Sequence, residues 1–373
     1  MAEEYQADEV DKSRERSQWR RMWRRFRRHT LGQVGGVIVL IIAIVIFMAN
    51  FIAPYSFKAQ HRDFANAPPT TIHFMDEDGL TWPYVYATKK EYNEYFEKVY
   101  VEDKSKKYPI KFFVKGEKYS FWGLFESRIH LFGTGTMEAP VFLFGTDKFG
   151  RDLFSRTLWG GWISLLIGPF ALVTTLLIAV PIGLLSGYFG GWVDMLVQRI
   201  TEVVMAFPKL PLWLALAMVI QGLPSAYRFF FIVAVFSLVD WTGLSRTLRG
   251  MVLSAREEDY TMAAKAAGAG PLRIMFRHIL PNTTTYLVVI STLSIPTWII
   301  SEASLSYLGL GIKEPQTSWG LLLSQANNLE TITSYPWLLI PGIFIVVMVL
   351  AFNFLGDGLR DAADPFSTVG GNQ

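Results

Sequence analysis

The stretch of sequence that decides the fold is Glu257–Asn282, EEDYTMAAKAAGAGPLRIMFRHILPN, a polar and basic segment between two long apolar ones. Ser254 and Glu257 have the S-x-x-E spacing of a helix capping box, and the acidic residues at 257–259 place negative charge at the positive end of a helix dipole. Small residues then recur at helical spacing and leave one helix face with little side-chain bulk. That face consists of Tyr260, Ala263, Ala264 and Ala267. Such a helix favours close docking of another protein.

Glycine and proline divide this segment into two predicted helices. The run Gly268–Gly270 is expected to end the first helix, with Gly268 in a backbone conformation that a side chain makes costly. Pro271 suits the first turn of a second helix over Leu272–Leu280. The second helix should stop before Pro281, because a proline inside a helix removes a hydrogen bond and clashes with the preceding turn.

The composition is that of a membrane protein. Hydrophobic residues make up 51% of the 373 residues and charged residues only 18%, which is low for a soluble protein. The chain has no cysteine, which excludes a disulfide framework, a thiolate metal site and a cysteine nucleophile. The sequence also contains no G-x-x-x-x-G-K-[ST] P-loop, no H-E-x-x-H zinc motif and no G-x-S-x-G nucleophile elbow. We therefore expect a non-catalytic chain without cofactor or metal, for which any energy from ATP comes through another polypeptide.

The N-terminal region predicts a membrane span with a basic cytoplasmic flank. Nine Lys and Arg residues between Lys12 and Arg28 precede Leu31–Ala53, an uncharged segment long enough to cross a bilayer. This apolar run is longer than that of a signal peptide, so we expect it to be retained. A basic block beside a span is normally an orientation signal. The alternative, nucleic-acid binding by the arginines, is not expected.

Five further segments complete a prediction of six spans. They are Trp162–Leu185, Met195–Ile220, Tyr227–Leu244, Thr285–Leu308 and Trp337–Leu355. The second of these is the weakest, because Arg199, Glu202 and Lys209 interrupt it. Counting it as a span keeps the loop 246–277, which carries six Lys and Arg residues, in the cytoplasm.

The resulting fold class is an all-α polytopic membrane protein with a small α+β extracytoplasmic insert. Along the chain we expect a basic cytoplasmic tail 1–30, a first span 31–53, an extracytoplasmic loop 54–158, a transmembrane core 159–356 that includes the cytoplasmic loop 245–282, and a cytoplasmic tail 357–373.

The extracytoplasmic loop is far too long for an ordinary connection. Within it, Glu91–Tyr100 predicts a short amphipathic helix, and Lys107–Phe121 predicts a hairpin that turns at Gly116-Glu117. We expect a small external α+β cap over the translocation path. The alternative is a solvated insertion with no role beyond stability.

Four ordered motifs resemble those of ATP-binding cassette (ABC) importer permeases. The docking segment resembles their cytoplasmic EAA loop, E-A-A, three residues, Gly, nine residues, I-x-L-P, although Met262 and His278 stand where that pattern has Glu and Ile. The matching positions are Ala263, Ala264, Gly268, Leu280 and Pro281. The variant RHILPN and three other stretches are similar to the second-permease, or C-type, subunits of oligopeptide and dipeptide importers. These stretches are GTDKFGRDLFSR (Gly145–Arg156), SEASLSYLGLG (Ser301–Gly311) and FNFLGDGLRDAADP (Phe352–Pro365).

The resemblance implies a type I ABC importer permease in the bacterial inner membrane, with both termini in the cytoplasm. Its implied partners are a homologous permease, two ATPase subunits that carry ATP and magnesium, an extracytoplasmic solute-binding protein and membrane lipid. The implied ATPase-coupling residues are Glu258, Tyr260, Ala263, Ala264, Gly268, Ala269, Arg277 and Pro281. The implied cargo is peptide, with oligosaccharides and nickel left open. A secondary transporter would need its own coupling-ion residues, and a membrane enzyme would need a catalytic set.

Charged residues near or within the spans are the remaining candidates for function, because charge in hydrocarbon is costly. Arg199 and Glu202, three residues apart, predict an internal ion pair, and Asp240 is expected near Arg246. Glu302 is the best single candidate for contact with a translocation pathway or another subunit. The full set of such candidates is Phe207, Asp240 and Glu302.

Two further features of the sequence bear on the spans. Pro208 and Pro211 are expected to break the third span where it could line a pathway. Before the second span, the motif GTDKFGRDLFSR is expected to form an amphipathic interfacial helix with ion pairs along one face. Those pairs would involve Asp147, Arg151, Asp152 and Arg156, and direct contact with cargo is the alternative.

Overall fold

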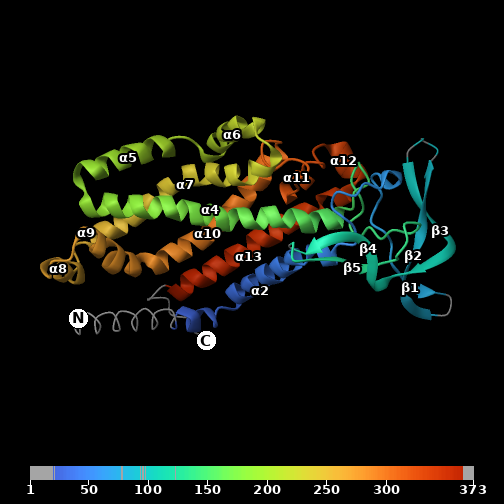
Figure 1. The fold of residues 1–373 in the computed structure, drawn as a ribbon, viewed down its shortest axis with the longest axis horizontal. Helices are drawn as coiled ribbons and strands as arrows, with labels where there is room; N and C mark the ends of the chain where they lie inside the picture. Colours follow the sequence, from blue (N-terminus) through green and yellow to red (C-terminus); the bar gives the residue numbers. More distant parts are fainter. Residues whose placement is uncertain are drawn as a thin grey trace.

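The computed structural model describes residues 20, 22–76, 79–92, 94, 96, 98–121 and 123–363. Most of the predicted basic tail and the last ten residues of the C-terminal tail lie outside the described residues. The molecule is elongated, with long helices running side by side along most of its length and the strands β1–β5 gathered at one end (Figure 1). The short helix α8 (Asp259–Ala266) lies at the opposite end.

Five helical segments are long and apolar enough to cross a membrane. They are Thr30–Phe47 (α2), Leu153–Phe189 (α4), Ser225–Ala255 (α7), Pro271–Tyr307, which includes α10 (Leu280–Tyr307), and Pro336–Ala363, which includes α13 (Ile340–Ala363). Each contains, or ends within a few residues of, one of the predicted spans, and a four-residue helix Ala49–Ile52 (α3) extends the first. The span prediction is therefore confirmed for these five segments.

The sixth candidate span is broken in two. Helix α5 (Gly191–Met205) and helix α6 (Lys209–Val219) pass the test for a span only as a pair, and they meet at an angle of 87°. The break comprises residues 206–208. Pro208 disfavours helical backbone at the residue before it, and it cannot donate a backbone hydrogen bond. The predicted break in the third span is confirmed.

The helices pack closely through glycines. A Cβ added at Gly35 of α2 would lie 2.4 Å from the carbonyl oxygen of Ala351 in α13, and one at Gly187 of α4 would lie 2.7 Å from Cβ of Val252 in α7. Small residues let backbones approach in this way in membrane bundles. The large buried side chains of the core are Trp213, Ile232, Phe236, Trp298, Ile299, Trp319 and Phe352.

The insert between α3 and α4 is built of two antiparallel units in its described residues. Strands β1 (His73–Asp76), β2 (Gly79–Tyr92) and β3 (Lys98–Pro109) form one sheet in that order, and β4 (Lys111–Phe121) pairs with β5 (Phe125–Gly133). A single 3-10 turn, Arg62–Phe64, precedes the strands. Val85, Ile110, Ala139 and Val141 form the buried core of the insert.

Both local predictions for the insert are wrong. Glu91 and Tyr92 end β2, Lys98–Tyr100 begin β3, and Glu91 pairs with Val99. Gly116 and Glu117 lie within β4, at an irregularity in its pairing with β5, and that hairpin turns instead between Phe121 and Phe125. In both cases cross-strand pairing overrides a weak local pattern, as is common for strands.

Candidate functional site

Helix α8 and the turn that follows it form the docking segment predicted from the sequence. Helix α8 begins one residue after Glu258, whose side chain makes no capping hydrogen bond, and Asp259 lies in its first turn. Helix α7 continues to Ala255, so the predicted capping box of Ser254 and Glu257 is wrong. The acidic residues still lie at the positive end of the helix dipole.

One side of α8 is packed against the helix bundle. The Thr261 side chain is buried and donates a hydrogen bond to the carbonyl oxygen of Ala255 at 2.7 Å. Ala264 and Ala269 pack on a buried cluster that includes Leu248 and Met275. Ala264 is thus half-buried against its own chain, rather than facing outward as the spacing predicted.

The opposite side of α8 is exposed and consists largely of small and apolar residues. Ala263 is exposed, and Tyr260 and Met262 are 38% and 50% exposed. Leu272 and Phe276, just beyond the turn, are 64% and 49% exposed. We call this surface the docking face; its members are Tyr260, Met262, Ala263, Ala266, Ala267, Leu272 and Phe276.

Gly268 ends α8 as predicted. Its φ of +80° is in the left-handed region, and the Ala269 N–H donates to the Ala264 carbonyl at 3.0 Å, which closes the helix end. A Cβ at Gly268 would meet open space, so its backbone conformation, rather than crowding, disfavours other residues.

The second predicted helix does not stop before Pro281. Helix α9 (Pro271–Arg273) leads into a π-helical turn, Ile274–Ile279, and then directly into α10 with Pro281 in its first turn. The wider π turn accommodates a proline that lacks an N–H, so the chain continues without a break. Arg277 and Pro281, both predicted coupling residues, lie half-buried at this junction.

A second group of candidate residues lies among the spans. The buried carboxylate of Asp240 in α7 accepts from Lys209 Nζ at 2.7 Å and from Trp298 Nε1, in α10, at 2.8 Å. Asp240 was expected to lie near Arg246, but its ionic partner is Lys209. Six positions separate Asp240 from Arg246 along the helix, which places them on different faces.

The other candidates near the spans have different surroundings. Glu302 is fully buried and accepts hydrogen bonds from Ser164 at 3.0 Å and Ser306 at 2.6 Å, so it joins helices of its own chain rather than facing a pathway or another subunit. Phe207 is 57% exposed at the bend between α5 and α6. The predicted pair of Arg199 and Glu202 is confirmed at 2.8 Å, but both side chains are exposed.

A buried charge cluster lies before α4, near the insert. Asp147 accepts from Arg151 Nε at 2.7 Å and from Arg156 Nη1 at 3.1 Å, and Glu314 accepts from Nη1 of Arg151 at 3.0 Å and Nη2 of Arg156 at 2.7 Å. Helix α4 begins only at Leu153, so the predicted amphipathic helix over this motif is wrong. Of the ion pairs at a spacing of four, Asp147–Arg151 forms, whereas Arg156 pairs with Asp147 and Glu314. Sequence reasoning did not identify Glu314 as a member of this cluster. Its charge, next to Pro315 in the loop after α10, was the one signal that could have pointed to it.

Asp152 caps α4 in this cluster. Its carboxylate accepts from the Ser155 N–H at 2.8 Å, and burial raises the pKa of Asp152 to about 7. Burial likewise raises the pKa of Glu314, against the lowering effect of Arg151. Arg151 thus favours the charged form of Glu314, whereas hydrogen bonds from Ser155 favour the charged form of Asp152.

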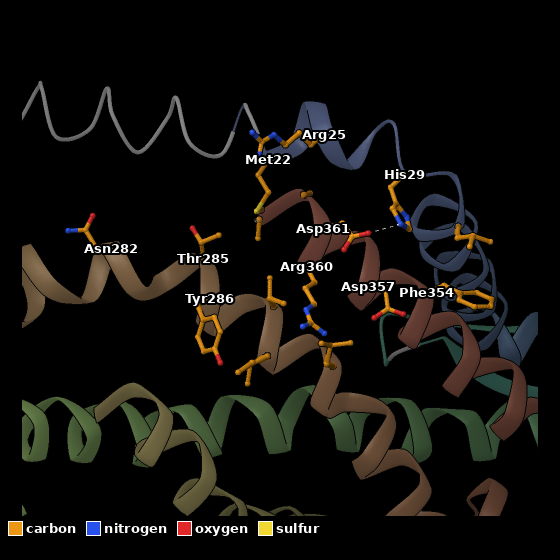
Figure 2. A pocket seen from close by; sticks show the side chains of 16 residues that line it. Met22, Arg25, His29, Asn282, Thr285, Tyr286, Phe354, Asp357, Arg360 and Asp361 are labelled. Carbon is orange, nitrogen blue, oxygen red and sulfur yellow. Dashed lines mark ion pairs between the residues drawn. The ribbon is translucent and has the colours of Figure 1, made fainter. Parts of the chain in front are cut away.

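A large open cavity of about 1250 Å³ lies where the start of α2 approaches α10 and α13. Figure 2 shows Asn282, Thr285 and Tyr286 of α10 on one side of this opening, and Asp357 and Arg360 of α13 on the other. His29 and Asp361 form an ion pair of 3.2 Å at its edge (Figure 2). Its mixed apolar and polar lining makes it a second candidate for contact with cargo or another subunit.

The fold and these surfaces define a multi-pass membrane protein with an exposed docking segment between two of its spans. The chain belongs to the family of binding-protein-dependent transport system inner membrane components, whose model matches residues 179–368. A model of the N-terminal transmembrane domain of oligopeptide transport permease C matches residues 17–69. The predicted family, a peptide-type ABC importer permease of the C-type, is confirmed.

Several curated relatives are similar over about 60% of the chain. The dipeptide transport system permease protein DppC of Alkalihalophilus pseudofirmus is 43% identical over 223 residues, which cover 60% of this chain and 71% of the relative. The oligopeptide transport system permease protein OppC of Bacillus subtilis is 42% identical over 224 residues, covering 60% and 71%. A solved structure of the MetNI methionine ABC transporter matches with a TM-score of 0.38 at 19% identity, over 54% of this chain and 94% of the matched chain. This similarity is too low to support a conclusion about the fold or function of this chain.

Proposed function

We propose that this chain is one of two transmembrane permease subunits of an ATP-driven peptide importer and that separate ATPase subunits dock on α8. The exposed docking face carries this proposal, because it presents a smooth helix between two spans in a chain that belongs to this family. The sequence has no P-loop. ATP and magnesium would therefore be bound by the ATPase subunits, and this chain would bind no cofactor itself.

The connection from α8 to α10 supports a coupling role. The chain runs from the turn at Gly268 through α9 and the π turn into α10 without a break. The cluster beneath α8 also contains Leu184 of α4 and Val252 of α7. A force on α8 would therefore reach three spans, and rocking of these spans would open the pathway to alternate sides of the membrane.

The remaining partners follow from the proposed complex. They are a homologous permease, an extracytoplasmic solute-binding protein and bacterial inner-membrane lipid, with no nucleic acid. The names of the similar permeases favour peptides over oligosaccharides or nickel as cargo. The exposed apolar side chains of α2, including Leu40 at 60% exposure, suit contact with lipid or with the second permease.

Uptake into proteoliposomes tests this function. Vesicles that contain this chain, its permease partner and the ATPase subunits should accumulate labelled dialanine when ATP and the loaded solute-binding protein are supplied. Omission of this chain or of ATP should abolish the accumulation. Uptake that persists without ATP and follows an ion gradient would favour a secondary transporter instead.

The proposed orientation makes a separate prediction. Lys104 in β3 and Lys265 in α8 are both exposed and lie at opposite ends of the molecule (Figure 1). In this Cys-free chain, Lys104→Cys should react with a membrane-impermeant maleimide in intact cells, whereas Lys265→Cys should react only after the cells are opened. The reverse pattern of labelling would invert the proposed topology.

A further inference from the structure

A small cavity with a mixed polar and apolar lining lies where α4, α6, α7 and α10 meet. Its volume is about 200 Å³, and α4, α7 and α10 contribute lining residues from the middle of their lengths. Its charged and hydrogen-bonding lining residues include Thr175, Lys209, Asp240, Ser291, Ser294 and Trp298. The cavity therefore brings an ionic pair and several hydroxyls into the interior of the bundle.

The two charges of this cavity are held very differently. The Asp240 side chain is 8% exposed and is fixed by Trp298 Nε1, whereas the Lys209 side chain is 59% exposed at the bend that begins α6. The Lys209 side chain can therefore rotate out of the cavity towards its exposed surface while the Asp240 carboxylate stays in place. A buried carboxylate left by its cation needs another positively charged partner.

Two buried hydroxyl groups also line the cavity without a partner. Thr175 Oγ1 and Ser291 Oγ have no hydrogen-bond partner within the part of the chain that the structure describes, although these residues are only 1% and 4% exposed. Unpaired buried polar atoms are costly and are rare in proteins. They line the same cavity as Asp240, so a group that donates hydrogen bonds into the cavity would satisfy all three.

The broken span places this cavity at a position suited to transport. Helix α6 begins at Lys209 after the 87° bend, so a discontinuous helix forms one wall. Membrane transporters commonly build their substrate sites from discontinuous helices near the middle of the bilayer.

We propose that this cavity binds the α-ammonium group of a transported peptide, with Asp240 accepting its hydrogen bonds in place of Lys209. Thr175 and Ser291 supply two further acceptors, since a hydroxyl can accept as well as donate. The cavity is smaller than the roughly 300–1,000 Å³ of typical small-molecule sites, so it takes the end of a peptide rather than the whole molecule. This inference rests on the proposed peptide transport and names the group that is recognised within the membrane.

Protection of an introduced cysteine tests the inference without relying on transport. Thr297 is exposed and lines the cavity, and the chain has no cysteine of its own. In the assembled transporter in nanodiscs, dialanine should slow the reaction of Thr297→Cys with N-ethylmaleimide, read on this chain by mass spectrometry. N-acetyl-dialanine, which lacks the ammonium group, should not slow it.

Two charge variants sharpen the test. Adding Asp240→Asn should raise the dialanine concentration for half-protection by about tenfold or more, because a charge-assisted hydrogen bond is lost. Lys209→Gln should lower that concentration, because it removes the cation that competes for Asp240. This opposite effect separates recognition of the ammonium group from general damage to the fold.

The control is Ile300→Cys, which lies about one turn along α10, is 46% exposed and does not line the cavity. Its modification should be the same with and without dialanine. Equal protection of Thr297→Cys by both peptides would overturn recognition of the ammonium group. If Thr297→Cys is not protected in a complex that takes up dialanine, the cavity is not a peptide site, and the proposed function remains intact. A wild-type complex that takes up no peptide would instead overturn the proposed function.

Discussion

Replacement of Ala263 by arginine should abolish peptide uptake and release the ATPase subunits while the chain remains folded in the membrane. Ala263 is exposed on the docking face, so an arginine there has room in the isolated chain but not against a closely fitted partner. Loss of a central contact typically costs about 2 kcal/mol or more, which is roughly a thirtyfold loss of affinity. Co-purification of the ATPase subunits and ATP-dependent uptake measure the two effects.

A matched control separates docking from folding. Ala226, at the start of α7, is also exposed on a helix but lies far from the docking face. Ala226→Arg should leave ATPase co-purification unchanged. Ala264→Arg, by contrast, should reduce the amount of folded protein, because Ala264 packs on the cluster beneath α8. Normal uptake by Ala263→Arg would remove α8 as the site of coupling.

The spans were predictable because their signal is local. An apolar run of sufficient length predicts a membrane helix, and the five unbroken spans meet that test. The break of the third span was also predictable, since Pro208 acts through its own backbone. The end of α8 at Gly268 follows from the same kind of local chemistry.

Several errors concern contacts between distant parts of the chain, and others concern local backbone geometry. Asp240 pairs with Lys209, which lies 31 positions away in the sequence, and no helical spacing could show this contact. Residues 91–92 and 98–100 are strands because β2 and β3 pair with each other. The π turn before α10 accommodates Pro281 in the first turn of that helix, so the helix does not end there.

The docking face shows how local and tertiary information combine. The sequence indicated which residues of α8 are small, but not which side of the helix rests on the bundle. The buried cluster under Thr261 and Ala264 decides that side. The exposed positions, including Ala263, are therefore the ones that a partner can contact.

The charge cluster before α4 makes the second large prediction, a loss of stability when Asp147 becomes asparagine. Asp147 is fully buried and accepts hydrogen bonds from two buried arginine side chains, Arg151 and Arg156. Removal of its charge leaves two buried guanidinium groups with Glu314 as their one acidic partner among the residues that the structure describes. Breaking a buried ion pair from one side typically costs about 3–5 kcal/mol.

Thermal unfolding of the purified protein, followed by size-exclusion chromatography with fluorescence detection, measures this loss. Asp147→Asn should lower the unfolding temperature markedly. The matched control is Glu314→Gln, which removes the other acid that contacts the same two arginines but whose side chain is 48% exposed. Water compensates an exposed charge far better than a buried one, so its effect should be well below that of Asp147→Asn. Equal effects of the two variants would show that burial of Asp147 does not set the strength of the cluster, and that the anchoring of α4 depends on Asp152 and the surrounding apolar packing instead.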